Sequence, residues 1–185
     1  MIDSKTESLW SHILGEAMRG PMIGTKLETI PSVMTEWSDW KVSHPDTTVV
    51  LMPRATSAYS RGFHNPDSGL LIGLLTSTGS KSWQFPTLYR SSPVNDTVDG
   101  IPVVVSLKRE TFTATIFDRR TGGRELTFRS RGDDIIDLET ESTWDLLSGL
   151  AVSGSLQGER LQLLPGIVSD SAVWSLYFES ENSKR

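Results

Sequence analysis

The chain has 185 residues, no cysteine and a formal charge of −5, from 18 Lys and Arg against 23 Asp and Glu. This length suits one ordinary domain or two small ones. Without cysteine, disulfides, thiolate catalysis and zinc–thiolate sites are excluded. The mild negative charge, with no basic run interleaved with aromatic residues, predicts that the protein does not bind nucleic acid.

Hydrophobic stretches are short throughout the chain. The N-terminus has no apolar core of signal-peptide length. The longest apolar stretch, Leu70 to Leu75, is interrupted by Gly73 and is far shorter than the roughly 20 residues that cross a bilayer. We therefore expect a soluble chain without a transmembrane segment. Its compartment is not indicated.

One sequence unit occurs twice, 134 residues apart. Residues 2–40 align without a gap on residues 136–174, and 13 of these 39 positions are identical. Unrelated segments share only a few identities at a fixed offset, so the pattern indicates a duplication. The identities are Ile2/Ile136, Asp3/Asp137, Thr6/Thr140, Glu7/Glu141, Ser8/Ser142, Trp10/Trp144, Gly15/Gly149, Ala17/Ala151, Gly20/Gly154, Gly24/Gly158, Leu27/Leu161, Pro31/Pro165 and Trp40/Trp174.

Each unit has a predicted local structure. Thr6 and Thr140 are typical N-caps, which predicts a short helix after each that ends at Gly15 or Gly149. Two short strands are expected around the next two glycines of each unit. A second helix is expected over residues 35–44 in the first unit and 170–179 in the second.

The predicted division of the chain follows the repeat. Residues 1–53 are expected to be the C-terminal half of a first unit, with a strand over Thr47 to Met52. Residues 54–69 are rich in Gly, Pro, Ser and Asn and are expected to be a linker. Residues 70–185 are expected to be a second, more complete unit.

The second unit has mostly β patterns. Asp99-Gly100 predicts a hairpin turn between strands 95–98 and 101–107. Phe112, Ala114 and Ile116 alternate with threonines, and residues 119–123 predict the next turn. The patterns together predict a β-rich α+β fold, an antiparallel meander or partial barrel with one wet face and short helices, internally duplicated. The basic side chains of residues 125–131 are expected on its solvated surface.

An ordered series of motifs carries a family resemblance. It begins with residues 94–103 (VNDTVDGIPV), continues through 116–120 (IFDRR), 123–128 (GRELTF) and 137–144, and takes in Gly154, Gly158, Leu161 and Pro165. This series resembles the bacterial domain-of-unknown-function family 3179. The first unit resembles the C-terminal half of the same domain. The resemblance covers most of the chain outside the linker, and it implies a fold more than an activity.

Two departures from the family pattern matter. The resemblance implies a Cys-Pro-x-Cys segment where this chain has Lys108 to Thr111, so the chemistry of those cysteines cannot occur here. The first copy is only half present, and Met1 falls inside the family pattern. We expect that the missing meander lies upstream in a longer, extracytoplasmic two-domain protein, or that the half unit packs on the second unit or on a partner.

The candidate site residues are few. Asp137 and Glu141 repeat Asp3 and Glu7 and could form an acid/base pair or a hard-cation site. A structural role is favoured, because an Asp before a helix and a Glu in its first turn satisfy free backbone N–H groups and the helix dipole. The three histidines are not at ligand spacing, and no nucleophile elbow or phosphate loop is present, so no catalytic residue, cofactor or transition metal is expected.

Tryptophan is frequent for this length, with six residues. Most are expected in cores, since large aromatic side chains dominate core and interface packing. Trp10, Trp37 and Trp40 are the candidates for an interface with a protein partner or with a second copy, because their half unit lacks its own meander. The leading hypothesis is a non-catalytic structural or protein-binding module. The alternatives are a cryptic enzyme or divalent-cation-binding protein that uses the repeated carboxylates, and part of a longer protein.

Overall fold

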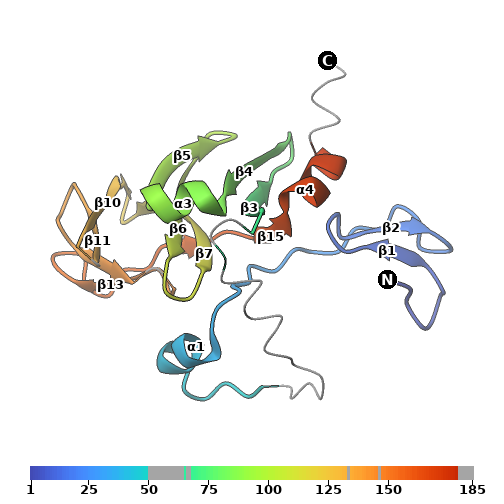
Figure 1. Ribbon diagram of the computed structural model, residues 1–185, viewed down its shortest axis with the longest axis horizontal. Coiled ribbons are helices and arrows are strands. Elements are labelled where there is room, and N and C mark those ends of the chain that lie inside the picture. Colours follow the sequence, from blue (N-terminus) through green and yellow to red (C-terminus); the bar gives the residue numbers. More distant parts are fainter. Residues whose placement is uncertain (50–64, 66–67, 133, 146, 179–185) are drawn as a thin grey trace. The chain divides into compact units, whose positions relative to one another are not determined.

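The computed structural model describes residues 1–49, 65, 68–132, 134–145 and 147–178 (Figure 1). In these residues antiparallel strands predominate over helices, and no sheet closes into a barrel. The predicted β-rich α+β class is confirmed. The chain divides into two compact units, Met1–Pro31 and Ser32–Arg185, and each is described here by itself. None of the described helices has the length and apolar content needed to span a membrane.

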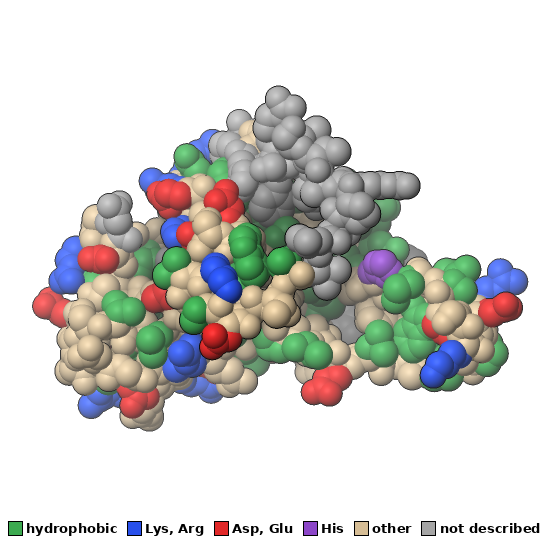
Figure 2. Space-filling model, turned by 90° about the horizontal axis from the view of Figure 1, so that it is seen from below, with side chains coloured by type: hydrophobic (Ala, Val, Ile, Leu, Met, Phe, Trp, Pro, Cys, Tyr) green, Lys and Arg blue, Asp and Glu red, His purple; other side chains and the backbone are tan. Residues whose placement is uncertain are grey.

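The first unit is a single two-stranded hairpin. Its strands are β1 (Leu9–Ser11) and β2 (Glu16–Arg19), and Trp10 pairs with Ala17 beside a bulge. Ala17 and Ser8 are buried, while most apolar side chains of the unit are exposed. Hydrophobic side chains gather on the surface of this unit, at the right of Figure 2.

The second unit is built around a four-stranded sheet in the order β14-β7-β6-β5. The long strands β6 (Ile101–Lys108) and β7 (Thr113–Asp118) form its centre, with β5 (Val94–Val98) and β14 (Gln162–Leu163) at the edges. Asp99 and Gly100 both have positive φ, at 48° and 77°, which makes the two-residue hairpin turn expected from the sequence.

Two further sheets accompany the central one. The first has the order β15-β3-β4, and the second has the order β10-β11-β12-β13. A two-stranded ribbon of β8 and β9 completes the strands. Their bounds are β3 Leu70–Leu75, β4 Ser80–Gln84, β15 Gly166–Asp170, β10 Phe128–Arg131, β11 Asp134–Asp137, β12 Thr143–Asp145, β13 Leu150–Ser153, β8 Arg120–Thr121 and β9 Arg124–Glu125.

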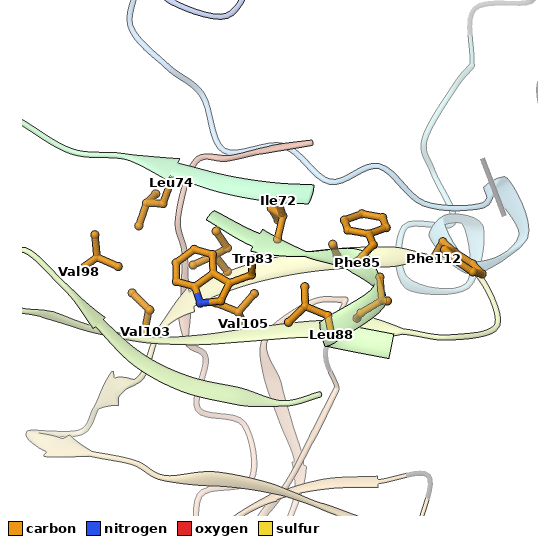
Figure 3. Packing of buried hydrophobic residues seen from close by; sticks show 12 residues of the cluster. Ile72, Leu74, Trp83, Phe85, Leu88, Val98, Val103, Val105 and Phe112 are labelled. Carbon is orange, nitrogen blue, oxygen red and sulfur yellow. The ribbon is translucent and has the colours of Figure 1, made fainter. Parts of the chain in front are cut away.

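Strand β6 separates two hydrophobic cores. Successive side chains of a strand point to opposite faces, and accordingly Val103 and Val105 lie in one core while Val104 lies in the other. The first core joins the central sheet to β3, β4 and helix α3 (Phe85–Ser91), with Trp83 at its middle (Figure 3). The second core joins it to the hairpin of β12 and β13.

The two remaining described helices are short. Helix α1 (Trp37–Ser43) contacts the β6–β7 hairpin through the ion pair of Asp39 with Lys108. Just before the helix, Thr35 accepts a hydrogen bond from the Thr113 hydroxyl at 2.7 Å. Helix α4 (Ser171–Phe178) follows β15 and buries Trp174 against Gly73 of β3. Both helices lie within the ranges expected from the sequence.

Three expectations about local structure are wrong. Residues 6–14 and 140–145 form a turn and the first strand of a hairpin, not a helix. The strands next to the glycines precede Gly20 and Gly154, and the glycines themselves lie in the turns that follow. The meander has no wet face at β7, because all six residues of that strand are buried between the two cores.

Other expectations fall partly outside the described residues. Thr47 to Val49 are not in a strand, and the rest of the expected strand 47–52 is not described. Most of the expected linker 54–69 is not described either, but β3 begins at Leu70, where the sequence pattern changes. Residues 125–131 alternate as expected, with Leu126 and Phe128 buried and their basic neighbours exposed.

Candidate functional site

A buried carboxylate organises the turn before the second hairpin. Asp137 ends β11, and its side chain is fully buried. Its Oδ2 accepts hydrogen bonds from Trp144 Nε1 at 3.0 Å and from Thr140 Oγ1 at 2.8 Å, and its Oδ1 accepts one from the Thr140 backbone N–H at 2.5 Å. Both oxygens are therefore engaged by residues of the same turn, which offsets the cost of burying them.

Ser142 extends this network to the end of the hairpin. Its hydroxyl lies 2.8 Å from Thr140 Oγ1 and accepts a bond from the Leu156 backbone N–H at 3.0 Å. Gly154 has φ of 96°, and a Cβ built on it would lie 2.6 Å from the Ser142 Cα. Only glycine fits this position, so the turn and the hairpin close as one unit.

The first unit repeats this network at an offset of 134 residues. Asp3 Oδ2 accepts hydrogen bonds from Thr6 Oγ1 at 2.6 Å and from Trp10 Nε1 at 3.1 Å, and Ser8 Oγ accepts one from the Met22 backbone N–H at 3.1 Å. The bond from the Thr6 hydroxyl, with those from its N–H and from Trp10, lowers the pKa of Asp3 far below its ordinary value. The strand register also repeats, including the bulge.

The two hairpins differ in how their apolar side chains are covered. In the second unit Ile135, Trp144, Leu156 and Leu161 belong to the second core, and all four are buried. Their counterparts in the first unit are half-buried or exposed, with Leu27 at 56% and Met1 at 64%. We call this set of the first unit the open face. Its residues are Met1, Trp10, Met22 and Leu27.

A glycine marks the centre of the covered surface in the second unit. Gly149 has φ of 68°, and a Cβ built on it would lie 2.6 Å from the Phe117 ring. The ring of Phe117 therefore rests directly on the hairpin backbone. The counterpart Gly15 has φ of 60°, but its nearest neighbours, the Cβ and carbonyl oxygen of Leu27, are 3.9 Å from such a Cβ. The open face thus has space where the second unit holds an aromatic ring.

A cavity of about 680 Å³ lies in the second unit, between the end of β6 and the outer sheet. Its wall includes Lys108, Arg109 and Glu110, which are three of the four positions where the family resemblance implies the cysteine segment.

Three of the charged groups of this wall have partners within the chain. Lys108 pairs with Asp39, and the Arg109 guanidinium lies 5.3 Å from the centre of the Tyr89 ring. Asp145 accepts bonds from the backbone N–H groups of residues 147 and 148. Groups that are held in this way stabilise the loops around the cavity, and their arrangement does not indicate a particular ligand.

The structure places the predicted carboxylates on different sides of one turn. Asp137 is buried and hydrogen-bonded, whereas Glu141 is exposed and has a left-handed backbone with φ of 57°. No helix follows them, so the expected helix-dipole role is wrong, although Asp137 does accept a backbone N–H. In the part of the chain that the structure describes, no three His, Asp or Glu side chains are grouped so that they could hold a metal ion.

The three candidate interface tryptophans have different surroundings. Trp10 is half-buried in the open face and bonded to Asp3. Trp37 is 45% exposed and lies 5.7 Å from Lys41 Nζ, measured to the ring centre. Trp40 stacks on His44 with ring centres 3.8 Å apart. Trp37 and Trp40 belong to α1, in the second unit, so only Trp10 lies in the open face.

Sequence patterns place Thr6, Thr140 and Gly15 at the ends of helices, so their part in these turns was missed, as was that of the two serines. Thr6 and Ser8, with Thr140 and Ser142, form the hydrogen-bond networks. Gly15 leaves the space that the Phe117 ring fills at Gly149. The repeated spacing Asp-x-x-Thr-x-Ser-x-Trp was the signal that could have found the networks. Asp, Thr and Ser side chains compete with helix formation by bonding to nearby backbone, which is typical of such turns.

The fold and the two hairpins define the structural class of the protein. The chain is a β-rich α+β protein with a central antiparallel sheet covered on both faces, and with an Asp–Thr–Ser–Trp turn that opens each of two equivalent hairpins. It belongs to the family described as protein of unknown function, DUF3179, whose model matches residues 1–71 and 64–180. The family resemblance is thereby confirmed. No match was found among the curated proteins or among the solved structures.

Proposed function

We propose that this protein is a non-catalytic module that binds another polypeptide through the open face of its first hairpin. The difference in exposure between equivalent side chains of the two hairpins carries this proposal. The same internal hydrogen bonds hold both hairpins, so the exposed face of the first is not a consequence of a different local fold. A face that is covered in one copy and open in the other is suited to binding a partner.

The absence of cysteine from the chain allows a direct test. A single cysteine introduced by Leu27→Cys is labelled with a benzophenone photocrosslinker and irradiated in an extract of the source cells. Lys26→Cys is the matched control, because its counterpart Arg160 is exposed whereas Leu161, the counterpart of Leu27, is buried. Mass spectrometry then identifies the crosslinked peptides.

A discrete polypeptide crosslinked from Leu27→Cys and not from Lys26→Cys is the expected result. Equal labelling from both positions, or no protein adduct from either, would contradict the proposal. Turnover of a substrate by the purified chain, abolished by Asp137→Asn, would contradict its non-catalytic part.

The competing proposal is a divalent-cation site at Asp137 and Glu141. The hydrogen bonds to both Asp137 oxygens support the structural role instead, since a cation would have to displace them. We expect that calcium or magnesium leaves the melting temperature unchanged and that Asp137→Asn lowers it with or without the cation. A cation-induced rise that Asp137→Asn removes would establish the cation site.

A further inference from the structure

Resting on that proposed function, we infer the class of the partner. The open face binds an antiparallel β-meander of another polypeptide, with one aromatic ring seated on Gly15 and one strand paired with Glu28 and Thr29. In the second unit both contacts are made within the fold of the unit itself. The first unit has the equivalent hairpin residues, and none of the described residues of its own fold makes these contacts with them.

The cover of the second hairpin is a sheet face with a defined chemistry. Val104 of β6 and Phe117 of β7 belong to the same core as the hairpin, and the Phe128 ring of β10 meets Trp144 edge-on at 5.8 Å between ring centres. Val104 and Phe117 thus come from adjacent strands of the central sheet, whereas Phe128 comes from β10, which lies in the same sheet as the hairpin. The open face presents Trp10 at the position of Trp144.

The space above Gly15 favours an aromatic side chain of the partner. In the second unit the Phe117 ring approaches Gly149 so closely that no side chain would fit there. Gly15 keeps the same left-handed backbone and has an open approach. A partner strand with an aromatic residue at the position of Phe117 fills this space, whereas an aliphatic side chain leaves part of it empty.

The segment after each hairpin supplies backbone pairing. In the second unit Gln162 and Leu163 form β14 and pair with Asp118 and Phe117 of β7. Their counterparts, Glu28 and Thr29, are exposed and pair with no strand in the described parts of the chain. Free backbone groups next to an apolar face favour the addition of a strand, because main-chain bonds and side-chain contacts form together. A partner helix could not make these backbone bonds, because its own backbone groups are already paired within the helix.

The test uses this chain's own meander as the probe. A full-length probe chain carries Gly149→Asn, whose side chain meets the Phe117 ring and displaces the probe's own second hairpin from it. Asn tolerates the left-handed backbone, so the substitution acts mainly through this contact. The probe also carries Gly15→Asn, which prevents its first hairpin from filling the place. Unlabelled probe is added to ¹⁵N-labelled wild-type chain, and the amide spectrum of the wild-type chain is recorded.

The expected result is a shift of the amide signals of residues 15–29 with the probe and not with unlabelled wild-type chain. A labelled chain with Gly15→Asn should bind the probe at least about tenfold more weakly. A labelled chain with Gly24→Asn should bind it as the wild type does. Gly24 is the matched control because it also has a left-handed backbone, with φ of 80°, and neither it nor its counterpart Gly158 has a neighbour within 4 Å of a built Cβ.

Two outcomes would overturn the inference. One is no perturbation of residues 15–29 by a probe that keeps its strands, and the other is equal weakening by Gly15→Asn and Gly24→Asn. If circular dichroism shows that the probe has lost its strands, Trp144→Ala replaces Gly149→Asn in it. A negative result together with a specific crosslink from Leu27→Cys removes the meander as partner and leaves the protein-binding function standing.

Discussion

At the residue scale, the protein stabilises two turns that include a costly backbone conformation. Glu7 and Glu141 have φ of 56° and 57°, a region that few side chains other than glycine enter. Each lies between the Thr and the Ser of its network. The Asp carboxylate and the two hydroxyls around it hold this conformation, because every bond they make requires the chain to turn there.

The Trp–Asp bond is the most direct target in this network. Trp144→Phe keeps most of the apolar volume but removes the N–H that donates to buried Asp137. We expect a loss of about 1–3 kcal/mol, because Asp137 Oδ2 then loses one of its two donors and keeps only the Thr140 hydroxyl. Urea denaturation of the second unit measures it. Trp10→Phe is the matched control and should leave the unfolding of the second unit unchanged. An unaltered midpoint for Trp144→Phe would contradict the role of the bond.

A second prediction concerns pH. The hydrogen bond from the Arg120 side chain lowers the pKa of Asp118 below its ordinary value of 3.8, and the charge of Arg119 adds to this. A carboxyl whose pKa is lower in the folded state stabilises the fold above the unfolded value and loses this contribution as the pH falls through the folded value. Between about pH 6 and about pH 3, Asp118→Asn should therefore lose less stability than the wild type. Urea denaturation at the two pH values measures the loss of stability of each protein. An equal loss for Asp118→Asn and for the wild type would contradict this prediction.

At the element scale, helix α4 is fixed to its sheet by one tight contact. A Cβ on Gly73 would lie 2.1 Å from the ring of Trp174, which is 2% exposed. Gly73 is the one interruption in the apolar strand β3, and the absence of a side chain there makes room for the indole. Because Ile72 and Leu74 of the first core point to the opposite face of β3, the helix covers the other face of this strand.

The prediction for this contact is a steric one. Gly73→Ala should destabilise the second unit by about 1–3 kcal/mol, the usual cost of overpacking a core, and should increase the exposure of Trp174 to a fluorescence quencher. Gly79→Ala is the control, because a Cβ there has no neighbour within 4 Å and its backbone is not left-handed. Equal effects of the two substitutions would show that Trp174 does not depend on the absence of a side chain at Gly73.

Elements with local signals were predictable from the sequence. Asp99-Gly100 specified its hairpin, since two adjacent residues with positive φ favour few other structures. The ranges of α1 and α4 were also predicted. The helices expected after Thr6 and Thr140 were wrong, because a Trp further along donates to the same carboxylate and a Ser hydroxyl pairs with the Thr hydroxyl, which fixes a turn. A capping residue alone does not distinguish these two structures.

The burial of both faces of β7 could not be predicted from the local sequence pattern. Thr113 and Thr115 alternate with apolar residues, a pattern typical of a strand with one solvated face. In the structure Thr115 lies 2.8 Å from Ser106 across the sheet, and Thr113 lies 2.8 Å from Thr111, hydroxyl to hydroxyl. Paired hydroxyls can be buried at little cost. Which threonines are paired depends on the neighbouring strand, so the alternation by itself does not settle burial.

At the scale of the whole molecule, the chain carries the same hairpin in two states of cover. In the second unit a meander of the same chain covers it. In the first unit the corresponding face is open, and Trp10, Met22 and Leu27 remain accessible to a partner. The family model matches a segment that contains each hairpin, residues 1–71 and 64–180.

Amide hydrogen exchange of the full chain tests this account most directly. Three backbone bonds have matched geometry in the two hairpins: Ala17 to Thr25 and Ala151 to Glu159, at 3.0 and 2.9 Å; Gly24 to Ala17 and Gly158 to Ala151, both at 2.9 Å; and Leu27 to Gly15 and Leu161 to Gly149, at 2.7 and 2.9 Å. Because the bonds match, a difference in exchange reports the cover. We expect the amides of Ala17, Gly24 and Leu27 to exchange at least about 100-fold faster than those of Ala151, Gly158 and Leu161 in the isolated protein. Equal protection of the matched amides would contradict the open face.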